Sequence, residues 1–167
     1  MKVLSLLQPW ANFVVTQMPF VKTHRPVKQW ETRSWAPSVN NLYRLQNAGM
    51  LIHASLAWKK YQKELIKEYP FDDFFRVDDD LITGKIIGWV KIGRVIKTED
   101  WKKEFNFDNE DYKNKIDISI EHAFGDYNDG RYAWEITDFK KFKTPTPAKG
   151  NLSLWEFDPS KLIGLPL

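Results

Sequence analysis

The sequence contains no cysteine among its 167 residues. This absence excludes disulfide bonds, cysteine-ligated zinc sites and thiol nucleophiles, and it suits a reducing compartment. Histidine is also scarce, because only His24, His53 and His122 occur, and their spacing is not that of metal ligands. We therefore expect no metal site and no cofactor.

Long apolar runs are missing as well. No segment reaches the roughly 18 apolar residues that a membrane-spanning helix requires. The N-terminus has one lysine and a brief apolar run before Gln8-Pro9-Trp10, which is too short for a signal peptide. We therefore expect a cytoplasmic protein with no membrane partner.

An excess of charge of one sign is lacking too. The chain has 25 Lys and Arg against 22 Asp and Glu, a net charge of +3, which is weak support for a polyanionic partner because binding requires clustered cations. The length predicts a single domain spanning residues 1–167. It does not fix the oligomeric state, and a monomer is the simplest expectation.

Aromatic residues are plentiful, with 8 Trp, 6 Tyr and 11 Phe. Two interpretations remain open. These side chains can fill the core and seams of a small barrel, or some of them can line a cleft and stack on bases or sugars.

Short apolar runs, many of them alternating, predict mostly strands and two main helices, which indicates an α+β fold. Residues 36–41 read as a loop because Pro and Asn favour turns, with a strand beginning at 42–44. The glycines in 84–96 predict bulges or sharp coiling. The expected strands are 3–7, 28–35, 50–54, 84–96, 132–136 and 152–157.

The expected helices follow Pro9 and Ser55. The second, over 56–69, is the longest, with aromatic residues on one face and lysines 59, 60, 63 and 67 at other angles. Those lysines indicate a solvated face or a surface that faces nucleic acid. We expect a short helix after Thr98 and an exposed, highly charged insertion over 102–117. The next segment, 117–124, is either strand or helix, and an extended loop follows at 144–147.

The densest charged and aromatic segment is Lys28–Trp35. Strand alternation places Glu31 and Arg33 on one face and Lys28 on the other. The three side chains can therefore meet only if Lys28 still lies in the preceding loop or a bulge intervenes. The simpler alternative is a salt-bridged strand face without function.

This segment, Lys-x-x-Glu-x-Arg-Ser-Trp, is preceded by Leu-Ser-Leu-Leu-Gln-Pro-Trp-Ala at 4–11, and the pair resembles the signature of the ASCH (activating signal cointegrator homology) domain, which belongs to the PUA-like superfamily. The similarity continues through 51–55, 84–101, 132–136, 147–150 and 154–155, and 102–120 match least. The resemblance implies a small PUA-like β-barrel of five or six strands with flanking helices.

It also implies a cleft beside the signature strand that receives RNA, another nucleic acid or a nucleotide-like small molecule. Lys28, Arg33 and Lys149 would pair with phosphate, Trp10 or Trp35 would stack, and Gln8 and Glu31 would contact base edges. Without the resemblance, His53 is either a core residue or a functional one, and Lys149-Gly150 is either a turn or a place where backbone N–H groups approach an anion. Transferred position by position, the cleft would be lined by Gln8, Trp10, Lys28, Glu31, Arg33, Ser34, His53 and Lys149.

Two alternatives come from other classes. One is a hydrolase that uses Lys28 and Glu31, similar to the ASCH-like amidohydrolases that act on acetylcytidine, or a ribonuclease in which Lys28 or His53 assists proton transfer. The sequence departs from the amidohydrolase pattern because Glu31 stands where those enzymes have a threonine, and Thr32 is its neighbour. The other alternative is a protein-interaction module of the coactivator type.

Overall fold

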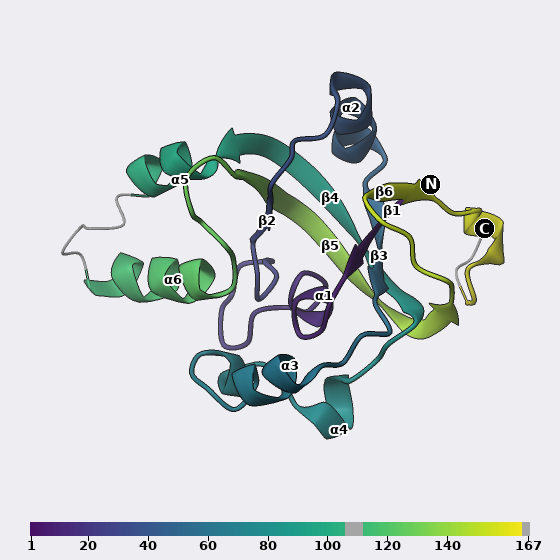
Figure 1. Cartoon of the computed structure of the whole chain (residues 1–167), viewed down its shortest axis with the longest axis horizontal. Helices are drawn as coiled ribbons and strands as arrows, with labels where there is room; N and C mark the ends of the chain where they lie inside the picture. Colours follow the sequence, from purple (N-terminus) through teal and green to yellow (C-terminus); the bar gives the residue numbers. More distant parts are fainter. Residues whose placement is uncertain (106–111, 165–167) are drawn as a thin grey trace.

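The computed structural model describes residues 1–105 and 112–164 and shows an α+β fold built on one curved sheet (Figure 1). Its helices and strands follow in the order β1 (Lys2–Leu6), α1 (Trp10–Phe13), β2 (Trp30–Arg33), α2 (Val39–Asn47), β3 (Met50–Ala54), α3 (Lys60–Leu65), η1 (Phe71–Asp73), α4 (Val77–Asp80), β4 (Lys85–Lys97), α5 (Thr98–Glu104), α6 (Tyr112–Ala123), β5 (Tyr132–Pro147), β6 (Leu154–Glu156) and η2 (Pro159–Lys161).

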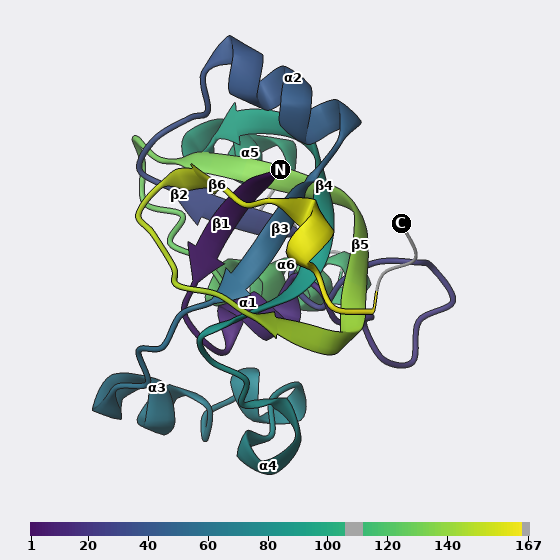
Figure 2. The ribbon, with the colours of Figure 1, turned by 90° about the vertical axis from the view of Figure 1, so that its right-hand side faces the viewer.

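The six strands form one sheet in the order β2-β5-β4-β3-β1-β6. Only β1 and β3 are parallel, and the other neighbours are antiparallel. The expected closed barrel is not seen, because β2 and β6 stay unpaired with each other at opposite edges in the part of the chain that the structure describes. The segment before β1 meets the segment after β6, where the N-terminal ammonium donates to the carbonyl oxygen of Phe157 at 2.7 Å (Figure 2).

The long strands β4 and β5 give the sheet its curvature. Their pairing shifts register near Ile86 and Gly88 and again between Ile92 and Val95, which confirms the bulges predicted from the glycines. A Cβ at Gly88 would lie 2.5 Å from the carbonyl oxygen of Lys140, so only glycine lets the two backbones approach this closely. The strand β5 continues through 144–147, which were expected to be a loop, and its last two residues, Thr146 and Pro147, pair with Ile86 and Lys85 of β4.

The helices depart most from expectation. Residues expected as a loop and then a strand form α2, because Ser38 Oγ accepts a hydrogen bond from the backbone N–H of Asn41 and caps it. The predicted helix over 56–69 shortens to α3, since the N–H of Ser55 donates to Leu6 and continues the ladder between β1 and β3. Its lysines at 59, 60, 63 and 67 are exposed as expected, but so is Tyr61.

Between α5 and β5, the described residues 112–123 form α6, and a loop over 124–131 follows it. This resolves the choice between strand and helix for 117–123 in favour of helix. The predicted insertion at 102–117 contains the end of α5 and the start of α6, and its residues 106–111 lie outside the described part of the chain.

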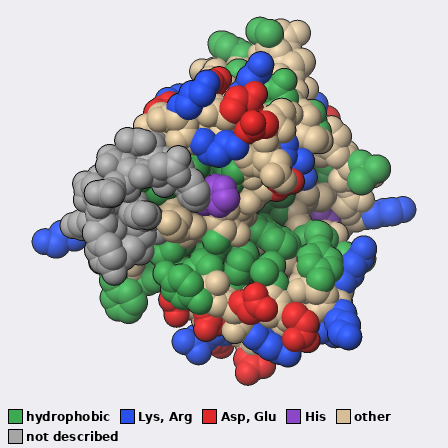
Figure 3. All heavy atoms as spheres, turned by 60° about the vertical axis from the view of Figure 1, so that its left-hand side comes forward, with side chains coloured by type: hydrophobic (Ala, Val, Ile, Leu, Met, Phe, Trp, Pro, Cys, Tyr) green, Lys and Arg blue, Asp and Glu red, His purple; other side chains and the backbone are tan. Residues whose placement is uncertain are grey.

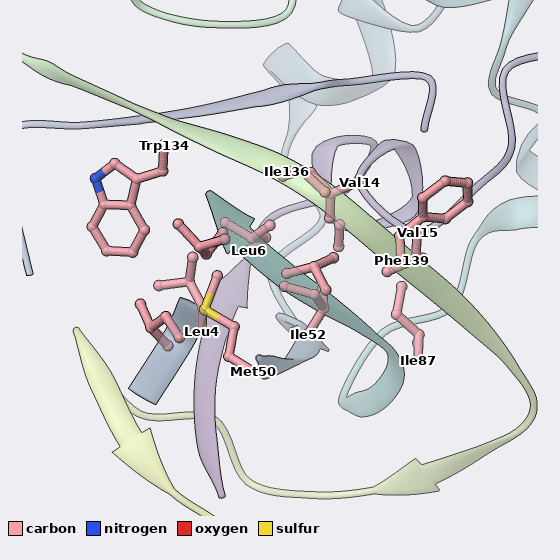
Figure 4. Close-up of a cluster of buried hydrophobic side chains, with 14 of the residues drawn as sticks. Leu4, Leu6, Val14, Val15, Met50, Ile52, Ile87, Trp134, Ile136 and Phe139 are labelled. Carbon is pink, nitrogen blue, oxygen red and sulfur yellow. The ribbon is translucent and has the colours of Figure 1, made fainter. Parts of the chain in front are cut away.

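Aliphatic side chains from β1, α1, β3, β4 and β5 pack in the main core, together with Trp134 (Figure 4). A second, mainly aromatic cluster joins α1 to α6 and η1 through Phe13, Phe71 and Phe124, whose rings lie 4.8–5.9 Å apart. This aromatic cluster fixes the position of α6 against the N-terminal segment. No helix in residues 1–105 and 112–164 combines the length and the apolar character that crossing a membrane requires.

Candidate functional site

Lys28, Glu31 and Arg33 form one charged cluster. Lys28 precedes β2, in the loop that the sequence required if its side chain was to reach the other two. Its Nζ donates to Glu31 Oε2 and to the carbonyl oxygen of Trp30, both at 2.6 Å. Arg33 Nε lies 3.2 Å from the other oxygen, Glu31 Oε1. A single carboxylate therefore faces two cations.

The three side chains differ greatly in burial. Lys28 is only 1% exposed and Glu31 is 6% exposed, whereas the Arg33 side chain is 27% exposed. Lys28 and Glu31 are thus a buried pair that neutralises itself, and the charge that reaches solvent belongs to Arg33.

Arg33 has donors to spare. Its Nη2 donates to the backbone carbonyl of Ser5 at 3.3 Å. Its Nε is buried, and within the described residues it has no hydrogen-bond acceptor, because the contact with Glu31 lacks hydrogen-bond geometry. A guanidinium carries five N–H donors, so most of them stay open to a ligand.

A cavity of about 430 Å³ opens beside this cluster, and we call it the first cavity. Trp10, Leu65, Phe71 and Phe124 supply an apolar wall, and the charged cluster supplies the opposite polar one. The lining consists of Ser5, Leu6, Leu7, Trp10, Lys28, Glu31, Thr32, Arg33, Leu65, Phe71, Ala123, Phe124, Gly125, Asp126 and Arg131. On the side that carries α5 and α6, apolar side chains gather beside a hollow, with charged side chains along its rims (Figure 3).

A second cavity, of about 590 Å³, lies against the other side of Arg33. It shares Ser5, Leu6, Leu7 and Arg33 with the first cavity, and we call the two together the groove. The remaining lining comes from the start of the β3–α3 connection and from the segment after β5, and consists of Trp35, His53, Ser55, Leu56, Lys149, Gly150, Asn151, Leu152 and Ser153.

His53 lies at the base of the second cavity with both ring nitrogens engaged. Nε2 lies 3.0 Å from the carbonyl oxygen of Ala148, which can only accept, so Nε2 carries the proton. Nδ1 then accepts from Ser5 Oγ at 3.1 Å, and Trp155 Nε1 donates to the same Ser5 oxygen. Burial lowers the pKa of His53, with the hydrogen bond to Ala148 opposing the shift. The neutral imidazole is therefore a structural link between β3, β1 and the segment after β5.

Glu121 holds the loop that carries Lys28. Its two oxygens accept from the backbone N–H groups of Gln29 and Trp30, each at 2.9 Å. Burial raises the pKa of Glu121, while the nearby charge of Lys28 and the two backbone donors act in the opposite direction. The same burial, with Glu121 and Glu31 close by, raises the pKa of Tyr127. Glu121 positions this loop, and no sequence pattern pointed to it.

The structure brings six of the eight predicted site residues to the groove. Trp10, Lys28 and Glu31 line the first cavity, His53 and Lys149 line the second, and Arg33 lines both. Gln8 is fully buried and donates to the carbonyl of Ile82, so it anchors the chain. Ser34 is exposed and belongs to neither cavity lining.

Sequence reasoning missed the far side of the first cavity. Asp126 and Arg131 lie 3.3 Å apart there, as an ion pair on the loop between α6 and β5. Gly130, whose φ of 82° is positive, belongs to a turn beside this ion pair. Phe71 and Phe124 gave no signal, because neither lies in a periodic segment.

Within the described ranges, no three or more His, Asp or Glu side chains gather where they could hold a metal ion. A scan of protein-family models and a search of curated proteins give no match to this chain. The function of the groove is therefore inferred from its geometry.

Proposed function

We propose that the groove binds a nucleotide unit, and that its ligand is single-stranded RNA or another nucleic acid. The observation that carries the proposal is the position of Arg33, a partly exposed guanidinium with open donors at the wall that the two cavities share. Planar guanidinium groups suit phosphate because they donate two parallel hydrogen bonds.

The charge of the groove supports an anionic ligand. Lys28 is balanced by Glu31, and Arg131 is balanced by Asp126. Arg33 shares Glu31 with Lys28, and Lys149 has no ion pair in the described part of the chain. Two positive charges therefore remain without full compensation, Arg33 in the shared wall and Lys149 in the second cavity.

The apolar wall of the first cavity supports a base rather than a bare anion. Trp10 is half-buried and meets Phe71 edge-on, with ring centroids 6.1 Å apart, so one face of this wall is aromatic. Stacking of a base on an aromatic side chain is worth about 1–3 kcal/mol and tolerates any base. A phosphate at Arg33 and a base against this wall together define a nucleotide.

The resemblance to ASCH domains leads to the same proposal. We propose that the chain is a member of that PUA-like family in which the sheet stays open between β2 and β6. In this proposal the segment Lys28–Trp35 has the role that the resemblance implies, with Arg33 and Lys149 on phosphate and Trp10 against a base.

Binding of a fluorescein-labelled oligouridine, measured by anisotropy, tests the proposal. We expect Arg33→Gln to weaken binding at least 10-fold and Lys149→Ala to weaken it about threefold, since each removes an uncompensated charge. Arg76→Gln and Lys143→Ala change exposed cations away from the groove and should bind like the wild type. Equal affinity of all four variants would overturn the proposal.

A hydrolase is the second candidate, favoured by the contact between Lys28 and Glu31 inside a ligand-sized cavity. A lysine and a carboxylate 2.6 Å apart can exchange a proton with a bound substrate. Release of acetate from N4-acetylcytidine, lost in Lys28→Ala, would support it. His53 is the weaker candidate as a base for RNA cleavage because both its nitrogens are engaged, so we expect any cleavage to survive in His53→Ala.

A further inference from the structure

We infer that the groove takes two consecutive nucleotides, one in each cavity, with the phosphate that joins them at Arg33. This inference rests on the proposed function and extends it from one nucleotide to a dinucleotide step. The first observation behind it is that the two cavities share four lining residues and so lie on either side of one wall, formed by Ser5–Leu7 and Arg33.

Each cavity is large enough for its own occupant. Small-molecule sites enclose about 300–1,000 Å³, and the two volumes, about 430 and 590 Å³, both fall in that range. A ligand confined to the first cavity would leave the second unfilled, although the second contains Lys149, one of the two uncompensated charges.

The two cavities offer different chemistry. The first has the aromatic wall and suits a stacked base. The second is bounded by the backbone of 149–153 and by Leu56 and Leu152, whose exposed fractions are 76% and 95%. Exposed leucines beside a lysine suit the apolar face of a second nucleoside whose own phosphate lies near Lys149.

The wall between the cavities has the donors that a bridging phosphate needs. Arg33 uses one N–H of Nη2 on the carbonyl of Ser5, and its buried Nε faces Glu31. The two N–H groups of Nη1 and the second N–H of Nη2 are left for a phosphodiester, whose two free oxygens can accept from them and whose single negative charge Arg33 balances.

The segment after β5 is held firmly enough to serve as one side of the second cavity. A Cβ at Gly150 would lie 2.5 Å from His53 Cε1 and 3.1 Å from Ser5 Oγ, so the backbone packs directly on the hydrogen-bonded chain of Ser5 and His53. The adjacent carbonyl of Ala148 accepts from His53 Nε2. This contact places Lys149 and Asn151 at the cavity before any ligand binds.

Calorimetric titration of three uridine ligands tests the inference: uridine 3′-monophosphate, UpU and UpUpU. The monophosphate already carries the phosphate that would meet Arg33, so UpU differs from it by the second nucleoside. We expect UpU to bind at least 10-fold more tightly than uridine 3′-monophosphate and UpUpU to gain less than threefold over UpU.

Asn151→Trp, which fills the second cavity, should remove the gain of UpU and leave the affinity for uridine 3′-monophosphate unchanged. Asn40→Trp, at an exposed position of α2, is the matched control and should behave as the wild type. Circular dichroism and the melting temperature establish that both variants fold.

The outcomes separate the two proposals. If neither uridine 3′-monophosphate nor UpU binds, the proposed function fails. If both bind equally, or if the affinity rises as much from UpU to UpUpU as from the monophosphate to UpU, nucleotide binding stands and the dinucleotide inference is overturned. It is also overturned if Asn151→Trp keeps the full gain of UpU.

Discussion

Lys28 carries a charge into the protein interior and depends on Glu31 there. Removing one partner of a buried ion pair costs about 3–5 kcal/mol, because the other charge is left without compensation. Here Arg33 stays 3.2 Å from Glu31 and limits the loss. We therefore expect Lys28→Met to lower the free energy of unfolding by about 3 kcal/mol, measured by urea denaturation.

The double variant Lys28→Met/Glu31→Gln tests whether the loss of stability comes from the charge of Glu31 that Lys28→Met leaves without its partner. It removes both charges, so we expect it to be more stable than the Lys28→Met single variant. Lys85→Met changes an exposed lysine and is the control. A Lys28 variant as stable as this control would show that the buried pair contributes nothing to folding.

His53 makes stability depend on pH in a direction that its burial fixes. Burial lowers the pKa of His53 below its ordinary value of 6.5, so in the window just below 6.5 the unfolded chain binds a proton that the folded chain does not. The free energy of unfolding must then fall as pH decreases through that window. NMR titration should give a pKa below 6.5 for His53, and His53→Gln should reduce the dependence of urea stability on pH. His24→Gln is the control, and an equal slope in both variants would contradict the prediction.

At the residue scale, most of the charged cluster could be predicted from the sequence. The spacing of Lys28, Glu31 and Arg33 on a strand lets the three side chains meet only if Lys28 precedes the strand or a bulge intervenes. It could not show that Lys28 is buried or that Gln8 anchors the chain. The burial of both residues depends on segments that are distant in the sequence. Gln8 contacts Ile82, in the loop before β4, and the loop of Lys28 contacts Glu121 of α6, and both contacts form only in the folded structure.

At the scale of elements, α6 holds the residues at the start of β2 in position. Glu121, near the end of α6, accepts the N–H groups of Gln29 and Trp30 with its two oxygens. A glutamine there offers one acceptor oxygen and turns an N–H₂ group toward the other donor. Leaving a buried donor unsatisfied costs about 1–3 kcal/mol.

We therefore expect Glu121→Gln to lower the free energy of unfolding by about 1–3 kcal/mol. Because the loop it holds carries Lys28, binding of oligouridine should weaken as well. Glu68→Gln, at an exposed position, is the control for stability. Unchanged stability in Glu121→Gln would mean that β2 keeps its position without this contact.

Helices and strands could be predicted from the sequence where a local pattern alone decides the structure. The alternation and glycines of β4 indicated both the strand and its bulges. Prediction failed where a neighbour decides the structure. Thr146 and Pro147 are extended because they pair with Ile86 and Lys85 of β4. The helix expected directly after Ser55 begins later, because the N–H of Ser55 donates to the carbonyl of Leu6 and continues the ladder between β1 and β3.

At the scale of the molecule, the groove combines segments that are far apart in the sequence. Ser5, His53 and Lys149 meet because β1 lies between β3 and β6 in the sheet, which brings the two ends of the chain to the same edge. Arg33 comes from β2 at the opposite edge, and it reaches β1 through its hydrogen bond to the carbonyl oxygen of Ser5. The resemblance to ASCH domains anticipated this gathering. It did not anticipate that Phe71 and Phe124 complete the aromatic wall beside Trp10, since neither phenylalanine lies in a segment that carries the resemblance.

The charge of the whole groove sets how binding responds to salt. Each phosphate that is neutralised contributes about 0.7 to the slope of log K against log salt for a single strand. Arg33 and Lys149 are the two uncompensated cations of the groove, so the slope for oligouridine should be about −1.4. Lys149→Ala should reduce its magnitude by about 0.7, and Lys143→Ala should leave it unchanged. A slope several times steeper would mean that the strand also contacts the exposed lysines of α3, and the groove would then be only part of the binding surface.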